Sequence, residues 1–129
     1  MANITFEQTE NGIEELQFKL EPIDSTISVK TEFSLSVNQN DVTLLKLQCN
    51  LSLSGDDNEK NFMYIKNYGI YKTNNTDTEL TLDKIDNAKE LMEDLIPSVN
   101  EVLSFISKKG LGDKIELPEN VPNAKDSSD

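Results

Sequence analysis

The chain has 129 residues, with 24 acidic and 12 basic side chains and a formal net charge of −12. Every basic residue is lysine, and histidine, arginine and tryptophan are absent. This composition argues against nucleic-acid binding, which needs positive charge at the phosphates. Because the chain has no histidine, it cannot form a Ser-His-Asp triad or a zinc site with histidine ligands. We therefore predict no nucleic-acid partner, no catalytic residues, no metal and no cofactor.

The length suits one domain, which we place at residues 1–117, followed by a disordered acidic tail over 118–129. No apolar run is long enough to cross a membrane, and the first residues lack the basic and apolar stretches of a signal peptide. Cys49 is the single cysteine, which suits a reducing compartment. We expect a cytoplasmic protein, and the preference for lysine, asparagine and isoleucine suggests a bacterial or phage source.

Alternation of apolar and polar residues predicts the strands of an antiparallel sheet with one wet face. We expect strands over 16–20, 27–37, 45–53 and 62–72. Polar turns at 38–41 and 55–58 indicate that successive strands are antiparallel neighbours. The acidic residues of the second turn lack the spacing of a calcium loop. Cys49 alternates with leucines, so it is predicted to be a buried apolar side chain rather than a nucleophile.

The strand over 62–72 carries apolar side chains on both faces. One face has Phe62, Tyr64, Tyr68 and Ile70, and the other has Met63, Ile65 and Tyr71. Because one helical layer covers only one face of a sheet, a subunit or a ligand would cover the second face. Two alternatives stay open: the strand is central in the sheet, or a bulge near Gly69 switches its faces.

After a polar loop, the apolar residues from Ala88 to Ile106 follow the three-and-four spacing of an amphipathic helix. Asp83 is the predicted N-cap. A straight helix from Asp83 to Lys109 would span about 40 Å, longer than the diameter of about 36 Å for a compact domain of this size. Pro97 also removes a backbone hydrogen bond. We therefore predict an α+β fold, in which a long helix broken or kinked at Ile96–Pro97 packs on one face of a four-stranded antiparallel sheet.

Three segments carry a family resemblance over roughly residues 16 to 121. In YIKNYGIY (64–71) a short polar run precedes glycine, isoleucine and an aromatic residue. In LIPSVNEVLSFISKKG (95–110) a glutamate follows the proline by four residues, and a glycine ends the segment; IELPENV (115–121) comes after it. In this order they resemble the third long strand, the signature helix and the following segment of the SecB export chaperones.

The resemblance implies tetramers built as dimers of dimers, and hydrophobic grooves that hold unfolded polypeptides. It places outward side chains of the third strand at a subunit interface, and these are Met63, Ile65 and Asn67. It assigns an aromatic peptide-binding groove to Tyr64, Tyr68, Tyr71 and Phe105. The chain departs from the family in having a polar tail in place of a second helix. Tyr64 also stands where an acidic residue helps to dock the SecA motor.

Together these observations predict a SecB-like, ATP-independent chaperone that shields hydrophobic segments of unfolded client proteins, as in protein transport. The alternative is a dedicated accessory protein, associated with a phage or a toxin–antitoxin system, that uses the same fold to bind one partner. In both cases we expect a homo-oligomer, either a dimer or a tetramer, without a membrane partner. A third possibility is that the chain is simply a small oligomeric domain, in which self-association buries the whole apolar surface of the strand over 62–72.

Overall fold

The computed structural model describes residues 3–18, 27–55, 61–111 and 115–117. Four strands are followed by a short 3₁₀ helix and one α-helix, and their bounds are β1 (Phe6–Phe18), β2 (Ile27–Val37), β3 (Leu44–Gly55), β4 (Asn61–Thr73), η1 (Leu82–Lys84) and α1 (Ala88–Leu111). The predicted tail over 118–129 lies outside the described residues. Within the described part of the chain, no helix has both the length and the apolar character needed to cross a membrane.

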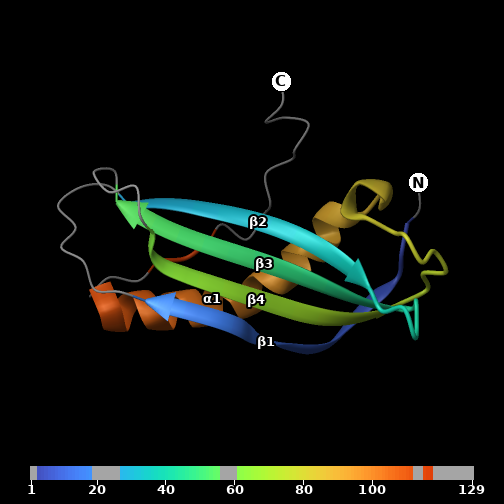
Figure 1. The fold of residues 1–129 in the computed structure, drawn as a ribbon, viewed down its shortest axis with the longest axis horizontal. Coiled ribbons are helices and arrows are strands. Elements are labelled where there is room, and N and C mark those ends of the chain that lie inside the picture. Colours follow the sequence, from blue (N-terminus) through green and yellow to red (C-terminus); the bar gives the residue numbers. More distant parts are fainter. Residues whose placement is uncertain (1–2, 19–26, 56–60, 112–114, 118–129) are drawn as a thin grey trace, which may run out of the picture.

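The strands form one antiparallel sheet in the order β1-β4-β3-β2 (Figure 1). The observed β2, β3 and β4 differ from the predicted strands by at most two residues at either end. β1 begins at Phe6, well before the predicted start at residue 16. The register of β1 against β4 shifts between Gln8 and Glu10 and again between Ile13 and Glu15. These irregularities break the period of two, which hid the first half of the strand from the sequence pattern.

α1 lies across one face of the sheet and closes a single apolar core against it (Figure 1). The largest fully buried side chains come from β3, β4 and α1: Leu45, Leu47, Leu51, Leu53, Met63, Ile65, Tyr71, Leu91, Leu95, Val99 and Leu103. Cys49 is buried among them, which confirms its predicted place. Burial raises the pKa of its thiol to about 12, so the thiol stays protonated at neutral pH.

α1 is one continuous helix that contains Pro97, so of the predicted break or kink the break is wrong. The helix starts later than expected, at Ala88, and its 24 residues span about 36 Å, which removes the need for a break. Pro97 is exposed, so its ring lies away from the core and water reaches the turn whose hydrogen bond it removes. Asp83 does not cap α1 either, because it lies in η1 and accepts a hydrogen bond from the Thr81 hydroxyl.

Two asparagines attach extended segments to the helix layer. Asn87, just before α1, accepts a hydrogen bond from Ile4 N through Oδ1 and donates one to Ile4 O through Nδ2, both at 2.9 Å. Asn100 in α1 accepts from Leu117 N at 2.7 Å and donates to Leu117 O at 3.0 Å. Each carboxamide therefore satisfies both backbone groups of one residue, as a neighbouring strand would.

Candidate functional site

The residues predicted to form an aromatic groove lie on three different surfaces. Tyr64 and Tyr68 are on the face of the sheet that α1 leaves open, and Tyr71 is buried on the opposite face. The Tyr71 hydroxyl accepts a hydrogen bond from Gln8 Nε2 at 2.8 Å. Phe105 is exposed on α1. The four side chains therefore do not form one groove, and only Phe105 presents most of its surface to solvent.

The predicted outward orientation of Met63, Ile65 and Asn67 is wrong. Their side chains point toward α1 and are only 1%, 0% and 3% exposed within this single chain. β4 is the central strand that one alternative described, and its register with β3 runs without a shift through Gly69. A subunit contact through the outer face of β4 would therefore use the alternate residues, such as Tyr64 and Tyr68.

A network of polar contacts crosses the open face of the sheet. Glu14 of β1 accepts hydrogen bonds from Lys46 Nζ at 2.6 Å and from Gln48 Nε2 at 2.7 Å, and it reaches over β4 to these β3 residues. Ser34 of β2 donates to Gln48 Oε1 at 3.2 Å. The hydrogen bonds to Glu14 lower the pKa of its carboxyl group. The Glu14 carboxylate therefore already accepts two hydrogen bonds from side chains of the same chain.

Tyr68 belongs to the same polar face. Its hydroxyl donates to Glu10 Oε2 at 2.8 Å, and Lys46 Nζ lies 5.5 Å from the centroid of its ring. The hydrogen bond to Glu10 raises the pKa of Tyr68. Because both the ring and the hydroxyl of Tyr68 have partners within the chain, this tyrosine is a weak candidate for binding an apolar peptide.

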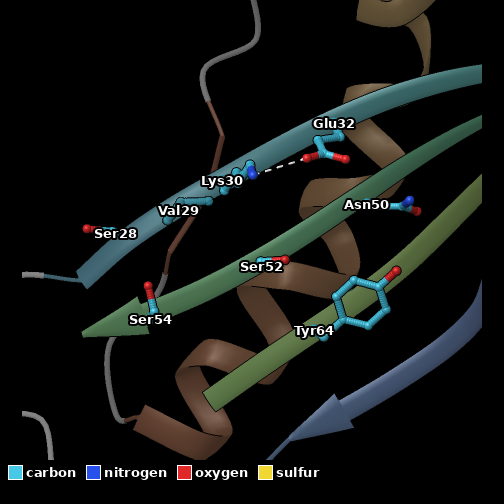
Figure 2. A pocket seen from close by; sticks show the side chains of 8 residues that line it. All are labelled: Ser28, Val29, Lys30, Glu32, Asn50, Ser52, Ser54 and Tyr64. Atoms are coloured by element: carbon cyan, nitrogen blue, oxygen red, sulfur yellow. Dashed lines mark ion pairs between the residues drawn. The ribbon is translucent and has the colours of Figure 1, made fainter. Parts of the chain in front are cut away.

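A shallow hollow of about 290 Å³ lies beside Tyr64 on the open face (Figure 2). Its lining is mostly polar and consists of Ser28, Val29, Lys30, Glu32, Asn50, Ser52, Ser54 and Tyr64. Lys30 and Glu32 form an ion pair at 3.3 Å across its β2 side. The described residues contain no group of three or more histidine, cysteine, aspartate or glutamate side chains that could hold a metal ion. The polar lining makes this hollow unsuited to apolar polypeptide.

Exposed apolar side chains gather instead along the β1 edge of the helix-covered face. Ile13, Leu16 and Phe18 of β1 pair with Asn67, Ile65 and Met63 of β4. Directly paired residues point to the same side of a sheet, so these three side chains face the layer of α1. They are nevertheless 40%, 46% and 39% exposed. α1 therefore leaves this border of the core uncovered.

Phe105 lies on the flank of α1 that faces this border. Asp94 of α1 accepts a hydrogen bond from Gln8 of β1 at 3.3 Å, which identifies the flank of α1 that faces β1. Phe105 follows Asp94 by about three helical turns, so it lies on the same flank, and it is 59% exposed. Figure 1 shows this C-terminal half of α1 passing behind the arrowhead end of β1. We call Ile13, Leu16, Phe18 and Phe105 the apolar strip.

Sequence reasoning found only part of the apolar strip. Leu16 and Phe18 were in the predicted early strand, and Phe105 was in the predicted groove. Ile13 was missed because the register shift beside it interrupts the alternation. The exposure of the strip could not be read from the pattern, because an alternating strand shows which face is apolar and not whether a helix covers it.

Comparisons with known proteins give a fold and no family. Neither protein families nor curated protein sequences match the chain. Among solved structures, the SecB-like chaperone of Mycobacterium tuberculosis, in complex with a ChAD peptide from the HigA1 antitoxin, is similar with a TM-score of 0.62. The similarity covers 92% of each chain at 10% sequence identity. The four-stranded antiparallel sheet with one long helix is thus a SecB-like fold, as the sequence predicted.

Proposed function

We propose that this chain is an ATP-independent, polypeptide-binding chaperone of the cytoplasm that shields extended apolar segments of client proteins. The observation that carries the proposal is the apolar strip, whose four large side chains are between 39% and 59% exposed. Several large apolar side chains exposed along one border of the surface are typical of an interaction site. The fold similarity to a chaperone that was determined with an antitoxin peptide supports a polypeptide as the occupant.

The position of the apolar strip suggests how a client is held. β1 is an edge strand of the sheet, so the backbone groups on its outer side are available to an extended segment. Main-chain hydrogen bonds to this edge would be independent of client sequence, while alternate client side chains would pack between Phe18 and Phe105. Two aromatic rings supply a large apolar contact area with little loss of rotamer freedom. Low sequence selectivity follows from this division of roles.

Charge is expected to set a second, weaker preference. Asp94 and Glu101 lie on or near the flank of α1 that borders the strip, and the whole chain carries a net charge of −12. Basic unfolded segments would be attracted to the part of this border near Asp94 and Glu101 and away from Lys109. The Nζ of Lys109 lies 5.9 Å from the centroid of the Phe105 ring. The surplus negative charge would keep the loaded complex in solution.

The test is suppression of aggregation of a thermally unfolded reporter enzyme, followed by light scattering. The wild-type chain at severalfold excess is expected to suppress scattering strongly, and the variant F18S/F105S is expected to lose most of this effect because it removes both rings of the strip. The matched control is V29S, which changes a side chain with 39% exposure at the opposite edge of the sheet. Absence of suppression by the wild type, or equal suppression by F18S/F105S, contradicts the proposal.

A second candidate is a dedicated accessory protein that binds one native or partly folded partner through the same strip. The antitoxin peptide of the similar structure supports it, since that complex contains one specific peptide. Affinity purification from the source cells separates the two functions. One stoichiometric partner that F18S/F105S no longer retains supports the dedicated role, whereas many unfolded clients support the general one.

A further inference from the structure

A second extended segment lies on the flank of α1 that faces away from β1. The Ser107 hydroxyl accepts a hydrogen bond from Ile115 N at 2.8 Å, and Asn100 pairs with both backbone groups of Leu117. Ser107 and Asn100 are about two helical turns apart, roughly 10 Å, whereas two fully extended residues span about 7 Å, so the segment must be extended and the two side chains reach across the remaining distance. The segment therefore runs antiparallel to α1 in an extended form.

The way this segment is held separates backbone contacts from side-chain contacts. The three hydrogen bonds from Asn100 and Ser107 all involve the backbone of the segment. The side chains of Ile115 and Leu117 pack against the apolar core, and Glu116 between them is exposed. Any extended segment with an apolar-polar-apolar pattern would satisfy these contacts. This flank therefore has the two features of a site for unselective polypeptide binding: backbone partners and an apolar floor.

The Ser107 hydroxyl makes one hydrogen bond within the helix and a second one to the extended segment. Ser107 is fully buried, and its hydroxyl donates to Ser104 O at 3.3 Å while it accepts from Ile115 N. Without a backbone N–H beside it, the buried hydroxyl would keep its hydrogen bond to Ser104 O but lose its donor, so an extended backbone on this flank completes its hydrogen bonding. The residue that supplies this backbone does not have to be Ile115.

We propose that the flank of α1 marked by Asn100 and Ser107 is a second polypeptide-binding site, and that Ile115–Leu117 occupies it as an internal competitor. An extended client segment with an apolar-polar-apolar pattern binds by displacing Ile115–Leu117 and taking over its backbone hydrogen bonds. The proposal rests on the polypeptide-binding function proposed above, and it adds a binding mode and a means of regulation. Because the competitor is tethered to the site at a high effective concentration, the unmodified chain binds free peptide weakly at this flank.

The experiment uses a fluorescein-labelled peptide with the sequence DKIELPE, which corresponds to residues 113–119, and full-length variants of the chain. Fluorescence anisotropy is expected to show that I115S/L117S binds this peptide about tenfold more tightly than the wild type, because the internal competitor is weakened. Adding N100A to that variant is expected to abolish the increase, because the backbone of the peptide then loses its partner. A purely structural role for the segment predicts no increase in either variant.

The controls separate this site from the apolar strip and from unfolding. Each variant is also measured with L16S/F18S added, which removes two apolar side chains of the strip, and the increase caused by I115S/L117S is expected to remain in that background. A peptide with serine at both apolar positions is expected not to bind. L117A perturbs folding less than the double change and is expected to give an increase of about threefold. Circular dichroism checks that each variant is folded.

Two outcomes overturn the proposal: I115S/L117S binds the peptide no more tightly than the wild type, or the increase persists after N100A is added. These readouts are independent of the aggregation assay. If I115S/L117S binds the peptide more tightly and N100A abolishes the increase, but the chain does not suppress aggregation, then the proposed chaperone activity is contradicted and the second binding site is supported. If the chain suppresses aggregation but the variants show none of the expected changes in peptide binding, then the second site is contradicted and the chaperone activity is supported.

Discussion

Asn87 and Asn100 give structure to segments that no strand pairs with. Each bonds to both backbone groups of a distant residue, and Asn87 is 83 positions from its partner Ile4. In the sequence these asparagines were indistinguishable from the many others in the chain, because nothing local marks a long-range backbone contact. Gly69 shows the same limit, since only the structure reveals that a Cβ there would come within 2.9 Å of Leu95. The glycine lets α1 approach the sheet.

Cys49 gives a prediction about pH at the scale of one residue. Burial raises the pKa of its thiol from the ordinary value of 9.0 to about 12, so the folded state disfavours the thiolate. The unfolded chain therefore gains from deprotonation first, and the stability from this group is complete below pH 9 or so and is lost as the pH rises toward 12. Between these values the free energy of unfolding is expected to fall by about 1.4 kcal/mol per pH unit.

The measurement for Cys49 is urea unfolding at several pH values between about 8 and about 11, for the wild type and for C49A. C49A is expected to be less stable at neutral pH by about 1 kcal/mol, because it leaves a small cavity, and to lack this part of the alkaline decline. Tyrosine and lysine titration affects both proteins alike and cancels in the comparison. Parallel pH profiles for the two proteins would show that Cys49 is not the source.

Among the elements, the regular ones were predictable and the irregular ones were not. β2 and β3 alternate without interruption, and their predicted bounds differ by at most two residues from those observed. β1 contains two register shifts, so its period of two fails and half of the strand was missed. The helix was predicted with the correct apolar face, but its start was placed at Asp83 because an acidic residue before an apolar run resembles a cap.

Pro97 gives a prediction at the scale of the helix. Because it lies inside a continuous helix and faces solvent, P97A is expected to restore one backbone hydrogen bond without altering the core. The free energy of unfolding should increase by about 1 to 3 kcal/mol, measured by urea denaturation. The neighbouring change S98A restores no hydrogen bond and should alter stability by about 0.5 kcal/mol or less. A loss of stability in P97A would instead show that a bend at this residue is needed to cover the sheet.

At the scale of the whole molecule, the fold class could be predicted because strand order and a single amphipathic helix leave few arrangements. The face of β4 that the helix covers could not be predicted, since Met63 and Tyr64 are both apolar and the sequence alone gives no reason to prefer either. The resemblance to an oligomeric family then suggested the wrong side. The apolar strip shows the same limit. Most of its residues were in predicted elements, but their exposure depends on which part of the sheet α1 covers, and the sequence pattern does not give this.

The apolar strip also leads to a prediction about assembly. If no client is present, a second copy of the chain is the most available partner for Leu16 and Phe18, because a shared edge strand and apolar border are self-complementary. Light scattering coupled to size exclusion is expected to give a dimer or tetramer of the 14.5 kDa chain, and L16S/F18S is expected to shift it toward the monomer. V29S, at the opposite edge, should leave the assembly unchanged. A wild-type monomer at every concentration contradicts this prediction.

The regularity of β2 has a consequence for behaviour at high protein concentration. β2 pairs with β3 through all 11 of its residues without a register shift, and in the described structure its other side is an edge of the sheet. A regular edge is a template for uncontrolled growth of a sheet from molecule to molecule, whereas the two register shifts of β1 limit pairing at its edge to short segments. The charged pair Lys30 and Glu32 stands on this edge strand. Because charged side chains on an edge strand oppose pairing with another molecule, we expect these two residues to limit fibre formation at this edge.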